Sequence, residues 1–158
     1  MEDSNLKENF ISAMRAISST VYVVSAKSGD ERHAMTAISV VSLSMEPPSI
    51  LVCINKKASI HSILSKTSFF CINILSSVQE SLSQVCSVSE EGESRFQDTS
   101  WEQDEDYVFN EESLSNIFCK CVDTIDHSSH TIFIAEVKRT LNNSSNEPLV
   151  YKSGKYLK

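Results

Sequence analysis

The stretch with the clearest chemical character spans residues 33–55 and reads HAMTAISVVSLSMEPPSILVCIN. It opens at His33, which we expect to be exposed, and places Met35, Thr36 and Ser39 in a run typical of a strand. Hydroxyl side chains are frequent and charges are few. No acid/base pair, metal-ligand cluster or glycine-rich loop lies nearby. A site here would therefore hold a molecule that brings its own chemistry, while the protein supplies orientation and electrostatics.

Histidines and cysteines offer two other kinds of chemistry, and neither has the spacing of a site. His127 and His130 stand three residues apart, but no third ligand lies near them, so we expect no metal site. We expect His61, in a short helical segment, to cap or pack. The odd number of cysteines, five, and the expected intracellular location argue against a disulfide framework. Cys119 and Cys121 share a face if they lie in a strand, so we expect both to pack inward.

Composition restricts the class of protein. The 158 residues suit one domain, which we expect to span residues 1–158. A net charge of −7 argues against nucleic-acid binding, because phosphate contacts need a basic face. No apolar run is long enough to span a bilayer, so we expect no membrane element. The first residues are acidic and polar, unlike a secretory signal, and we expect a cytoplasmic protein.

Periodicity predicts the elements that would position these residues. Helical spacing of apolar residues predicts an amphipathic helix over residues 5–18 and a short helix with Ile60, Ile63 and Leu64 on one side. β-branched and aromatic runs predict strands, which cover residues 20–24, 33–41, 49–55, 69–75, 116–125, 130–141 and 149–157. The run at 49–55 is apolar throughout, as expected of a strand buried on both faces. Gly29-Asp30 predicts a hairpin turn, and Pro47-Pro48 an extended corner.

Two further predictions concern the middle of the chain. Ser77 is expected to cap a helix, with Glu80 at the capping-box position. Residues 87–106 are polar and acidic, which predicts the most mobile stretch unless Phe96 and Trp101 anchor it to the body or to a partner. For Arg95, which lies in this stretch, we favour the interpretation of a solvated loop.

Many strands, short helices and hairpin turns predict a mainly β fold with peripheral α-helices. The expected architecture is a closed or half-open antiparallel barrel. The helical patterns are too few and too short for a doubly wound sheet. A barrel removes free strand edges, and its mouth or seam can hold a flat ligand.

Six segments align in order with one known family. They read AMRAISSTVYVV, HAMTAISVVSLSMEPP, VCINKKAS, FFCINIL, SSHTIFIAEV and PLVY. In these segments the chain resembles the flavin reductase-like proteins with an FMN-binding split β-barrel, the small reductase components of two-component flavin monooxygenases. The resemblance covers residues 13–156. Its specificity lies in the number and order of the segments, since no single one is specific.

The resemblance implies a flavin that lies along the barrel seam. The residues that would line it, carried over by position, are Met35, Thr36, Ala37, Ile38 and Ser39. The residues that would face its ribityl-phosphate end are Asn55, Ser59 and Lys57 or its neighbour Lys56. Asn73 would back the site through hydrogen bonds. His130 would correspond to the family histidine near the isoalloxazine and nicotinamide rings, which makes it the expected catalytic residue.

Several positions depart from the family pattern. Ala34 replaces the usual glycine and adds a methyl group where the backbone would approach closely. Ile38 replaces a common serine and removes one hydroxyl from the flavin wall. Ser128-Ser129 replaces Gly-Asp before the histidine. These departures bear on flavin affinity and on nicotinamide preference.

The function implied by the resemblance is NAD(P)H-dependent reduction of FMN or FAD by a homodimer that supplies a partner monooxygenase. A second hypothesis is an FMN-binding carrier or electron-transfer protein without reductase turnover. A third is a barrel that binds another flat ligand, such as haem or a pyridoxal phosphate relative. Considered without the family, Thr36 and Ser39 also suit a solvated strand face, Asn73 a buried structural amide, and Lys56-Lys57 an exposed pair.

Overall fold

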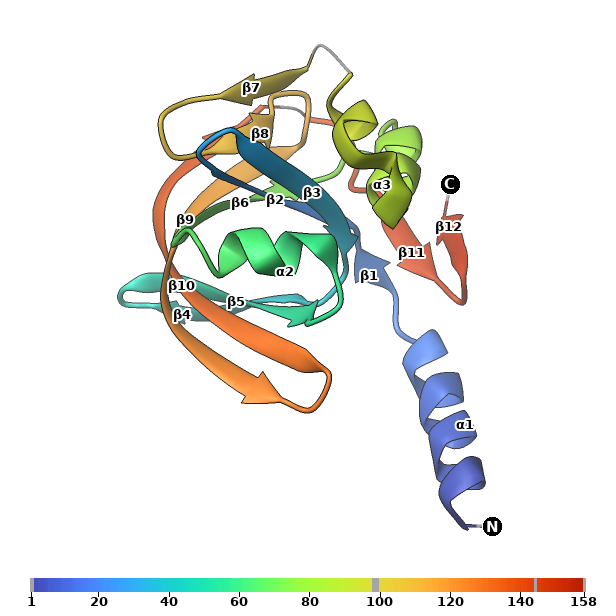
Figure 1. The fold of residues 1–158 in the computed structure, drawn as a ribbon. Coiled ribbons are helices and arrows are strands. Elements are labelled where there is room, and N and C mark those ends of the chain that lie inside the picture. The colour runs from blue at the N-terminus through green and yellow to red at the C-terminus, as the bar shows by residue number, and fades with distance from the viewer. Residues whose placement is uncertain (1, 98–99, 144, 158) are drawn as a thin grey trace.

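The computed structural model of the chain describes residues 2–97, 100–143 and 145–157, and antiparallel strands make up most of it (Figure 1). Its strands are β1 Ser19–Thr20, β2 Tyr22–Ser28, β3 Glu31–Ala37, β4 Val40–Met45, β5 Pro48–Asn55, β6 Phe69–Ile74, β7 Trp101–Gln103, β8 Val108–Asn110, β9 Ser115–His127, β10 His130–Asn142, β11 Val150–Lys152 and β12 Lys155–Leu157. Its helices are α1 Glu2–Arg15, α2 Ser59–Leu64, α3 Glu80–Cys86 and the 3₁₀ segment η1 Ser89–Phe96. The predicted mainly β fold with peripheral helices is confirmed.

Seven strands form one sheet in the order β3-β2-β6-β9-β10-β5-β4. The two edge strands, β3 and β4, are consecutive in the chain, and only Ile38 and Ser39 separate them. The sheet must therefore curl until its edges come close, which produces a barrel with one seam. The predicted turn at Gly29-Asp30 is confirmed, because Ser28 pairs with Glu31 across it. Gly29 has a φ of 59°, which glycine adopts without steric cost.

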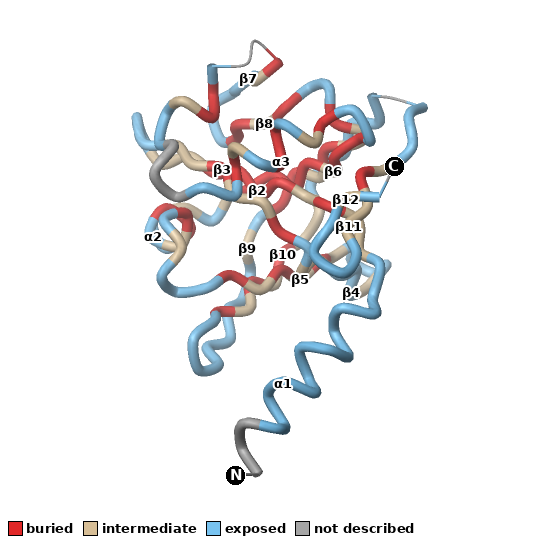
Figure 2. The backbone as a smooth tube through the Cα atoms, turned by 90° about the vertical axis from the view of Figure 1, so that its right-hand side faces the viewer, coloured by how far each residue is buried: buried red, intermediate tan, exposed pale blue. Residues whose placement is uncertain are grey.

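The barrel interior is filled from alternate positions of its strands (Figure 2). The side chains of β5 that point inward are Ile50, Val52 and Ile54. Leu51 and Cys53 face outward and are half-buried, so the prediction of a strand buried on both faces is wrong. Helix α2 covers this interior. Its buried side consists of the residues that the apolar spacing predicted, namely Ile60, Ile63 and Leu64.

A second apolar cluster lies outside the barrel, where α3 and η1 pack against β2 and β3. Gly92 interrupts η1 with a φ of 51° and a ψ of −131°. After this break, Arg95 is only 1% exposed and Phe96 only 7% exposed. Phe96 meets Trp101 edge to face at 4.9 Å. Anchoring of the acidic stretch by these two aromatic residues is confirmed, and the interpretation of Arg95 as part of a solvated loop is wrong.

Two predictions around the first hairpins are wrong. The expected strand over residues 33–41 is broken at Ile38 and Ser39, where the chain leaves one edge of the sheet for the other. The proline pair forms a tight hairpin and not an extended corner. The Glu46–Pro47 peptide is cis, and Met45 pairs with Pro48 across the turn.

The predicted start of the third helix is also wrong. Helix α3 begins at Glu80, and its N-cap residue Gln79 makes no capping bond with its side chain. The Gln79 amide instead accepts a bond from the Ser76 N–H at 3.0 Å and donates to Asn110 at 3.0 Å. Ser77 is held by a bond from its N–H to the Glu147 carbonyl. Tertiary contacts thus replace the local cap.

Helix α1 extends away from the barrel (Figures 1 and 2). The predicted amphipathic helix over residues 5–18 is found slightly earlier in the chain, and its apolar side is left open. Leu6 is 70% exposed, Phe10 63% and Met14 48%. No helix among the described residues has the length and apolar character needed to cross a bilayer.

Candidate functional site

The end of β5 is the meeting point of the turn before α2 and the tip of the β9–β10 hairpin. Asn55, the last residue of β5, pairs with His130, the first residue of β10. The next N–H, that of Lys56, donates to the carbonyl of Ser129 at 2.9 Å. The hairpin tip and the turn after β5 are therefore held together by backbone bonds.

The seam between β3 and β4 joins the same region. The Ser39 hydroxyl donates to the Cys53 carbonyl at 2.9 Å, and the Cys53 N–H donates to the Ser39 carbonyl at 3.2 Å. This pair of bonds fixes the bend after β3 two residues from Asn55. Three segments that are far apart in the sequence thus meet at one end of β5.

The turn after β5 presents exposed polar side chains. The Asn55 side-chain carbonyl accepts the Lys57 N–H at 2.9 Å, and its backbone carbonyl accepts the Ala58 N–H at 2.9 Å. Such a local bond from asparagine fixes a turn. Lys56 lies 3.8 Å from the Asp126 carboxylate, whereas Lys57 forms no ion pair within the described part of the chain. Lys57 and Ser59, both exposed, are therefore available to an anionic ligand.

His130 stands at the exposed tip of the hairpin, two residues after a strained position. Ser128 has a φ of 50°, in the left-handed region that glycine prefers. The family has a glycine here because glycine adopts this backbone conformation without steric cost. The serine in its place costs about 1–2 kcal/mol of conformational free energy. The Ser129 hydroxyl lies 2.8 Å from Nδ1 of His130, which orients the ring.

The residues of β3 that were predicted to contact the flavin lie on two different faces of the strand. Met35 packs against the barrel interior, and Ala37 is buried there. Thr36 points to the opposite face, where its hydroxyl donates to the Ser83 carbonyl of α3 at 2.6 Å. Ile38, in the bend, is 49% exposed. The structure therefore brings residues 35–39 to the seam, with the Thr36 hydroxyl engaged by the protein itself.

Asn73 lies apart from this group, fully buried in a polar network. Its amide nitrogen donates to the Val23 carbonyl at 2.8 Å and to the Ser25 hydroxyl at 2.9 Å. Its oxygen accepts the Asn110 N–H at 2.8 Å and the Asn116 amide at 2.9 Å. These bonds join β2, β6, β8 and β9, and satisfied buried amides of this kind fix strand positions. We assign Asn73 this structural role and leave it out of the site.

Two further residues of β3 differ from expectation. The Ala34 methyl group lies in the second apolar cluster, next to α3 and η1, and not at the seam. His33 is half-buried, with its Nδ1 3.0 Å from Nη1 of Arg95. Burial and the Arg95 charge lower the pKa of His33 to about 4. The prediction that His33 is exposed is therefore wrong.

The cysteines supply no reactive group to the site. All five are free, and Cys119 and Cys121 both pack toward the barrel interior, as predicted. Burial raises the pKa of Cys119 to about 12 and that of Cys86 to about 12. Thiols with a raised pKa are poor nucleophiles. Over residues 2–97, 100–143 and 145–157, no group of three metal-ligating side chains is close enough to hold a metal ion.

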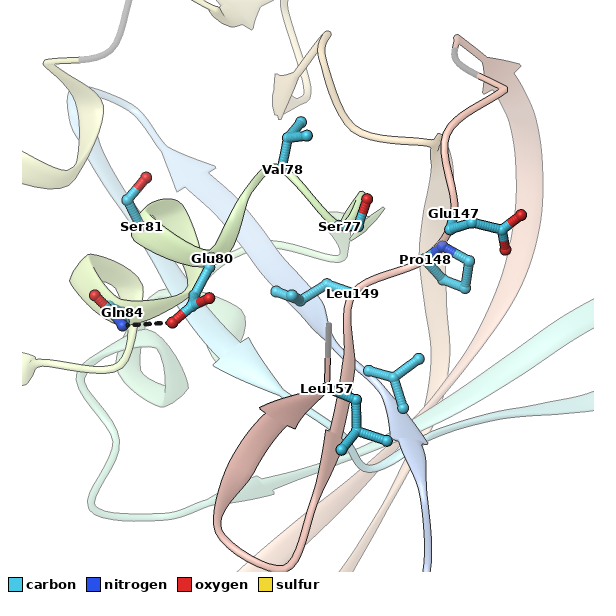
Figure 3. Close-up of a pocket in the computed structure, with 10 residues that line it drawn as sticks. Ser77, Val78, Glu80, Ser81, Gln84, Glu147, Pro148, Leu149 and Leu157 are labelled. Carbon is cyan, nitrogen blue, oxygen red and sulfur yellow. Dashed lines mark hydrogen bonds between the residues drawn. The ribbon is translucent and has the colours of Figure 1, made fainter.

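A hollow of about 870 Å³ lies on another side of the molecule, between α3 and the segment that contains β11 and β12 (Figure 3). None of the predicted site residues lines it. Glu80 and Glu147 border it, and their carboxylates disfavour a phosphorylated ligand. A smaller apolar groove of about 270 Å³ connects the seam to α1, because Ile38 lines it together with Phe10 and Tyr151.

The sequence pattern does not predict a hydrogen-bonded chain of polar side chains that includes Thr131, the neighbour of His130. His61 of α2, Thr131 of β10 and Asp126 of β9 form one hydrogen-bonded chain. The expectation that His61 packs is confirmed by its edge-to-face contact with Phe133 at 5.7 Å. Seventy residues separate His61 from Thr131, so no local pattern connects them. The only sequence signal was a threonine at the start of an apolar strand.

Comparisons with known proteins agree with this fold. The reductase component of an FADH(2)-dependent resorcinol hydroxylase from Rhizobium sp. (strain MTP-10005) is 34% identical over 152 residues, which cover 94% of this chain and 85% of the relative. The FMN reductase (NADH) RutF of Enterobacter cloacae is 27% identical over 146 residues, covering 92% of this chain and 89% of the relative.

Among solved structures, a putative flavin reductase from Haemophilus somnus 129PT superimposes with a TM-score of 0.88 at 27% identity, covering 95% of this chain and 97% of that one. The split-barrel prediction is thereby confirmed. The family model described as flavin reductase like domain matches residues 14–158, which include the seam, the β5 turn and the hairpin tip. With matches this extensive in sequence and in structure, the chain belongs to the flavin reductase-like family.

Proposed function

We propose that this protein is an NAD(P)H-dependent flavin reductase, which transfers a hydride from reduced nicotinamide to FMN or FAD. The observation that carries the proposal is the convergence of the seam, the β5 turn and His130 at one end of the barrel of a flavin reductase-like chain. An FMN reductase (NADH) and the reductase component of a hydroxylase, both similar along most of the chain, support it.

The residues at this end fit a flavin. The ammonium of Lys57 and the hydroxyl of Ser59 are exposed in the same turn as Asn55, a donor set that suits a phosphate. The bend at residues 35–39 offers a half-exposed apolar side chain, Ile38, beside the small residue Ser39, a surface on which a flat ring can lie. A bound flavin supplies the electron chemistry, so the chain needs no acid/base pair.

His130 orients the nicotinamide in this proposal. Its ring is held by the Ser129 hydroxyl and stands across from Asn55, at the border of the phosphate and ring positions. Holding two reactants in the productive geometry contributes much of an enzyme's rate. The reduced flavin then leaves for a monooxygenase, which is supported by the name of the Rhizobium relative, the reductase component of an FADH(2)-dependent hydroxylase. The single domain over residues 1–158 and the cytoplasmic location stay predictions.

We also propose that the protein is a homodimer. The outer face of β4, β5, β10 and β9 is apolar, with cross-strand neighbours Val41, Leu51, Ile134, Cys53, Ile132 and Ile125. Val41 is 55% exposed and Ile125 49%. A contiguous exposed apolar face of this kind marks an interaction surface. Cys53 of this face also holds Ser39, so a second copy seated here would border the flavin position.

The reductase proposal is tested by adding FMN and then NADH to the protein under anaerobic conditions. Bleaching of the visible flavin band at catalytic protein concentrations is the expected result. His130→Ala should lower the rate of bleaching on the order of tenfold to hundredfold and leave flavin affinity unchanged, because it removes only the orienting side chain. Ser39→Val should weaken flavin binding.

His127→Ala is the matched control, since His127 pairs with His130 across the same hairpin and is exposed. Equal rates for His130→Ala and His127→Ala would contradict the role of His130. Flavin that binds but is not bleached by NADH would support the carrier hypothesis in place of the reductase. Absence of flavin binding would leave only a shared fold.

A further inference from the structure

The hairpin that carries His130 has little packing of its own. Residues 122–130, which include its tip, are all exposed. The first buried side chain after the tip is Thr131, which is 4% exposed. Besides the backbone bonds to the β5 turn, the side chain that fixes this part of the hairpin is Thr131, which points to the opposite face of β10 from His130.

Thr131 is held by two side chains from different elements. Its hydroxyl donates to the Asp126 carboxylate at 2.7 Å, and Nε2 of His61 lies 2.9 Å from the hydroxyl oxygen of Thr131. A threonine hydroxyl has only one proton, and that proton is given to the carboxylate. His61 must therefore be the donor in the other bond, which fixes the proton on its Nε2. The chain runs in one direction, from α2 through β10 to β9.

Both ends of the chain are themselves fixed. The His61 ring packs edge to face on Phe133 in the barrel interior. At the other end, the Thr131 hydroxyl and then the Lys56 charge lower the pKa of Asp126. The carboxylate thus stays ionised, and a hydrogen bond to an ionised acceptor is stronger than one between neutral groups.

We propose that His61, Thr131 and Asp126 are positioning residues, which hold the β9–β10 hairpin against α2 so that His130 stays opposite the Asn55–Lys57 turn. The kinetic part of this inference rests on the proposed reductase function. The structural part, the ordering of the hairpin tip, does not. Substrate binding at His130 should then depend on a residue that has no contact with substrate.

Thr131→Val tests this in the full chain, because valine keeps the shape and removes both hydrogen bonds. The expected results are an increase of about tenfold in the KM for NADH and in the rate of amide hydrogen exchange at His130 and at Lys56, whose N–H donates to the Ser129 carbonyl at the hairpin tip. Tenfold is the scale of one lost charge-assisted bond. Flavin affinity should stay within about twofold, because Lys57 and Ser59, the exposed groups proposed to bind the phosphate, make no hydrogen bond or ion pair with His61, Thr131 or Asp126. Thr131→Ser, which restores the hydroxyl, should behave as the wild type.

His61→Phe provides a second route should Thr131→Val not fold, since it keeps a ring against Phe133 and removes the donor. Unchanged exchange at the hairpin tip in both variants would overturn the proposal, as would a Thr131→Ser variant as impaired as Thr131→Val. Wild-type protein that failed to oxidise NADH would remove the reductase function instead. The exchange rates alone would then decide the positioning role.

Discussion

Two hydroxyls predicted to contact the flavin also hold the fold together. Ser39 ties the bend to β5 through the Cys53 carbonyl, and Thr36 ties β3 to α3 through the Ser83 carbonyl. The sequence alone left the choice between flavin contact and ordinary strand residue open. A hydroxyl that donates to a carbonyl still has lone pairs to offer a ligand, so the bond to Cys53 is compatible with the proposed flavin contact of Ser39.

His33 gives a pH dependence of stability that the sequence did not suggest. Its ring accepts a hydrogen bond from Arg95, a group that can only donate, so the folded state needs the neutral ring. Burial and Arg95 lower its pKa from 6.5 to about 4. Between these values the unfolded chain binds the proton and the folded chain does not. Stability should therefore be retained above pH 6.5 and decrease as the pH falls toward 4.

Urea unfolding at several pH values between 7 and 4 measures this effect. His33→Asn should flatten the decrease over that window, whereas His127→Asn, at the exposed end of β9, should keep the wild-type profile. Parallel profiles for the wild type and His33→Asn would show that His33 does not control the transition.

At the scale of elements, predictions succeeded where the signal is local. The apolar side of α2 and the Gly29-Asp30 turn are set by residues within one or two turns of chain. Predictions failed where a distant partner decides. The Gln79 side chain donates to Asn110, 31 residues away, and Ser77 does not cap α3. Arg95, for which a solvated loop was one interpretation, donates to the Ala34 carbonyl, 61 residues away. Such partners are outside the reach of periodicity.

Gly92 makes the placement of η1 possible. With a φ of 51° and a ψ of −131°, it lies in a region of backbone space that residues with a Cβ rarely occupy. A Cβ there would meet no atom within 4 Å, so the effect of a substitution is one of conformation and not of packing. Gly92→Ala should reduce the free energy of unfolding by about 1–3 kcal/mol.

Thermal unfolding would register the Gly92→Ala change as a lower Tm, by roughly 2–4 °C for each kcal/mol in a chain of this size. Gln97→Ala, an exposed position at the end of η1, is the matched control and should leave Tm unchanged. An unchanged Tm for Gly92→Ala would mean that η1 accepts another backbone path.

At the scale of the whole molecule, the order of six sequence segments predicted the barrel and the residues proposed for the site. It did not predict the hydrogen-bond network that holds the strands together. Asn73 was expected to back the flavin site through hydrogen bonds. Its side chain joins strands of the sheet, and its hydrogen-bond partners lie 37 to 50 residues from it in the sequence. The family pattern specifies positions along the chain. The partners of each buried amide depend on how the strands close, which no single segment determines.

The same closure leaves two apolar surfaces open, the side of α1 and the outer face of β4, β5, β10 and β9. Ile132 lies in the middle of the outer face, between Cys53 and Ile125. A carboxylate there would have to be desolvated on association, at a cost that exceeds what the lost apolar contact contributes. Ile132→Asp should therefore convert the proposed dimer into a monomer while the circular dichroism spectrum stays that of the wild type.

Light scattering during gel filtration measures the mass directly. The control is Thr124→Asp, an exposed position on the same hairpin whose partner is the inward-facing Phe133, so its side chain lies on the other face of the sheet. It should keep twice the mass of one chain. A wild-type monomer at all concentrations would reject the homodimer. A dimer that persists in Ile132→Asp would indicate that the two copies meet at α1 instead, where Phe10 and Met14 are exposed.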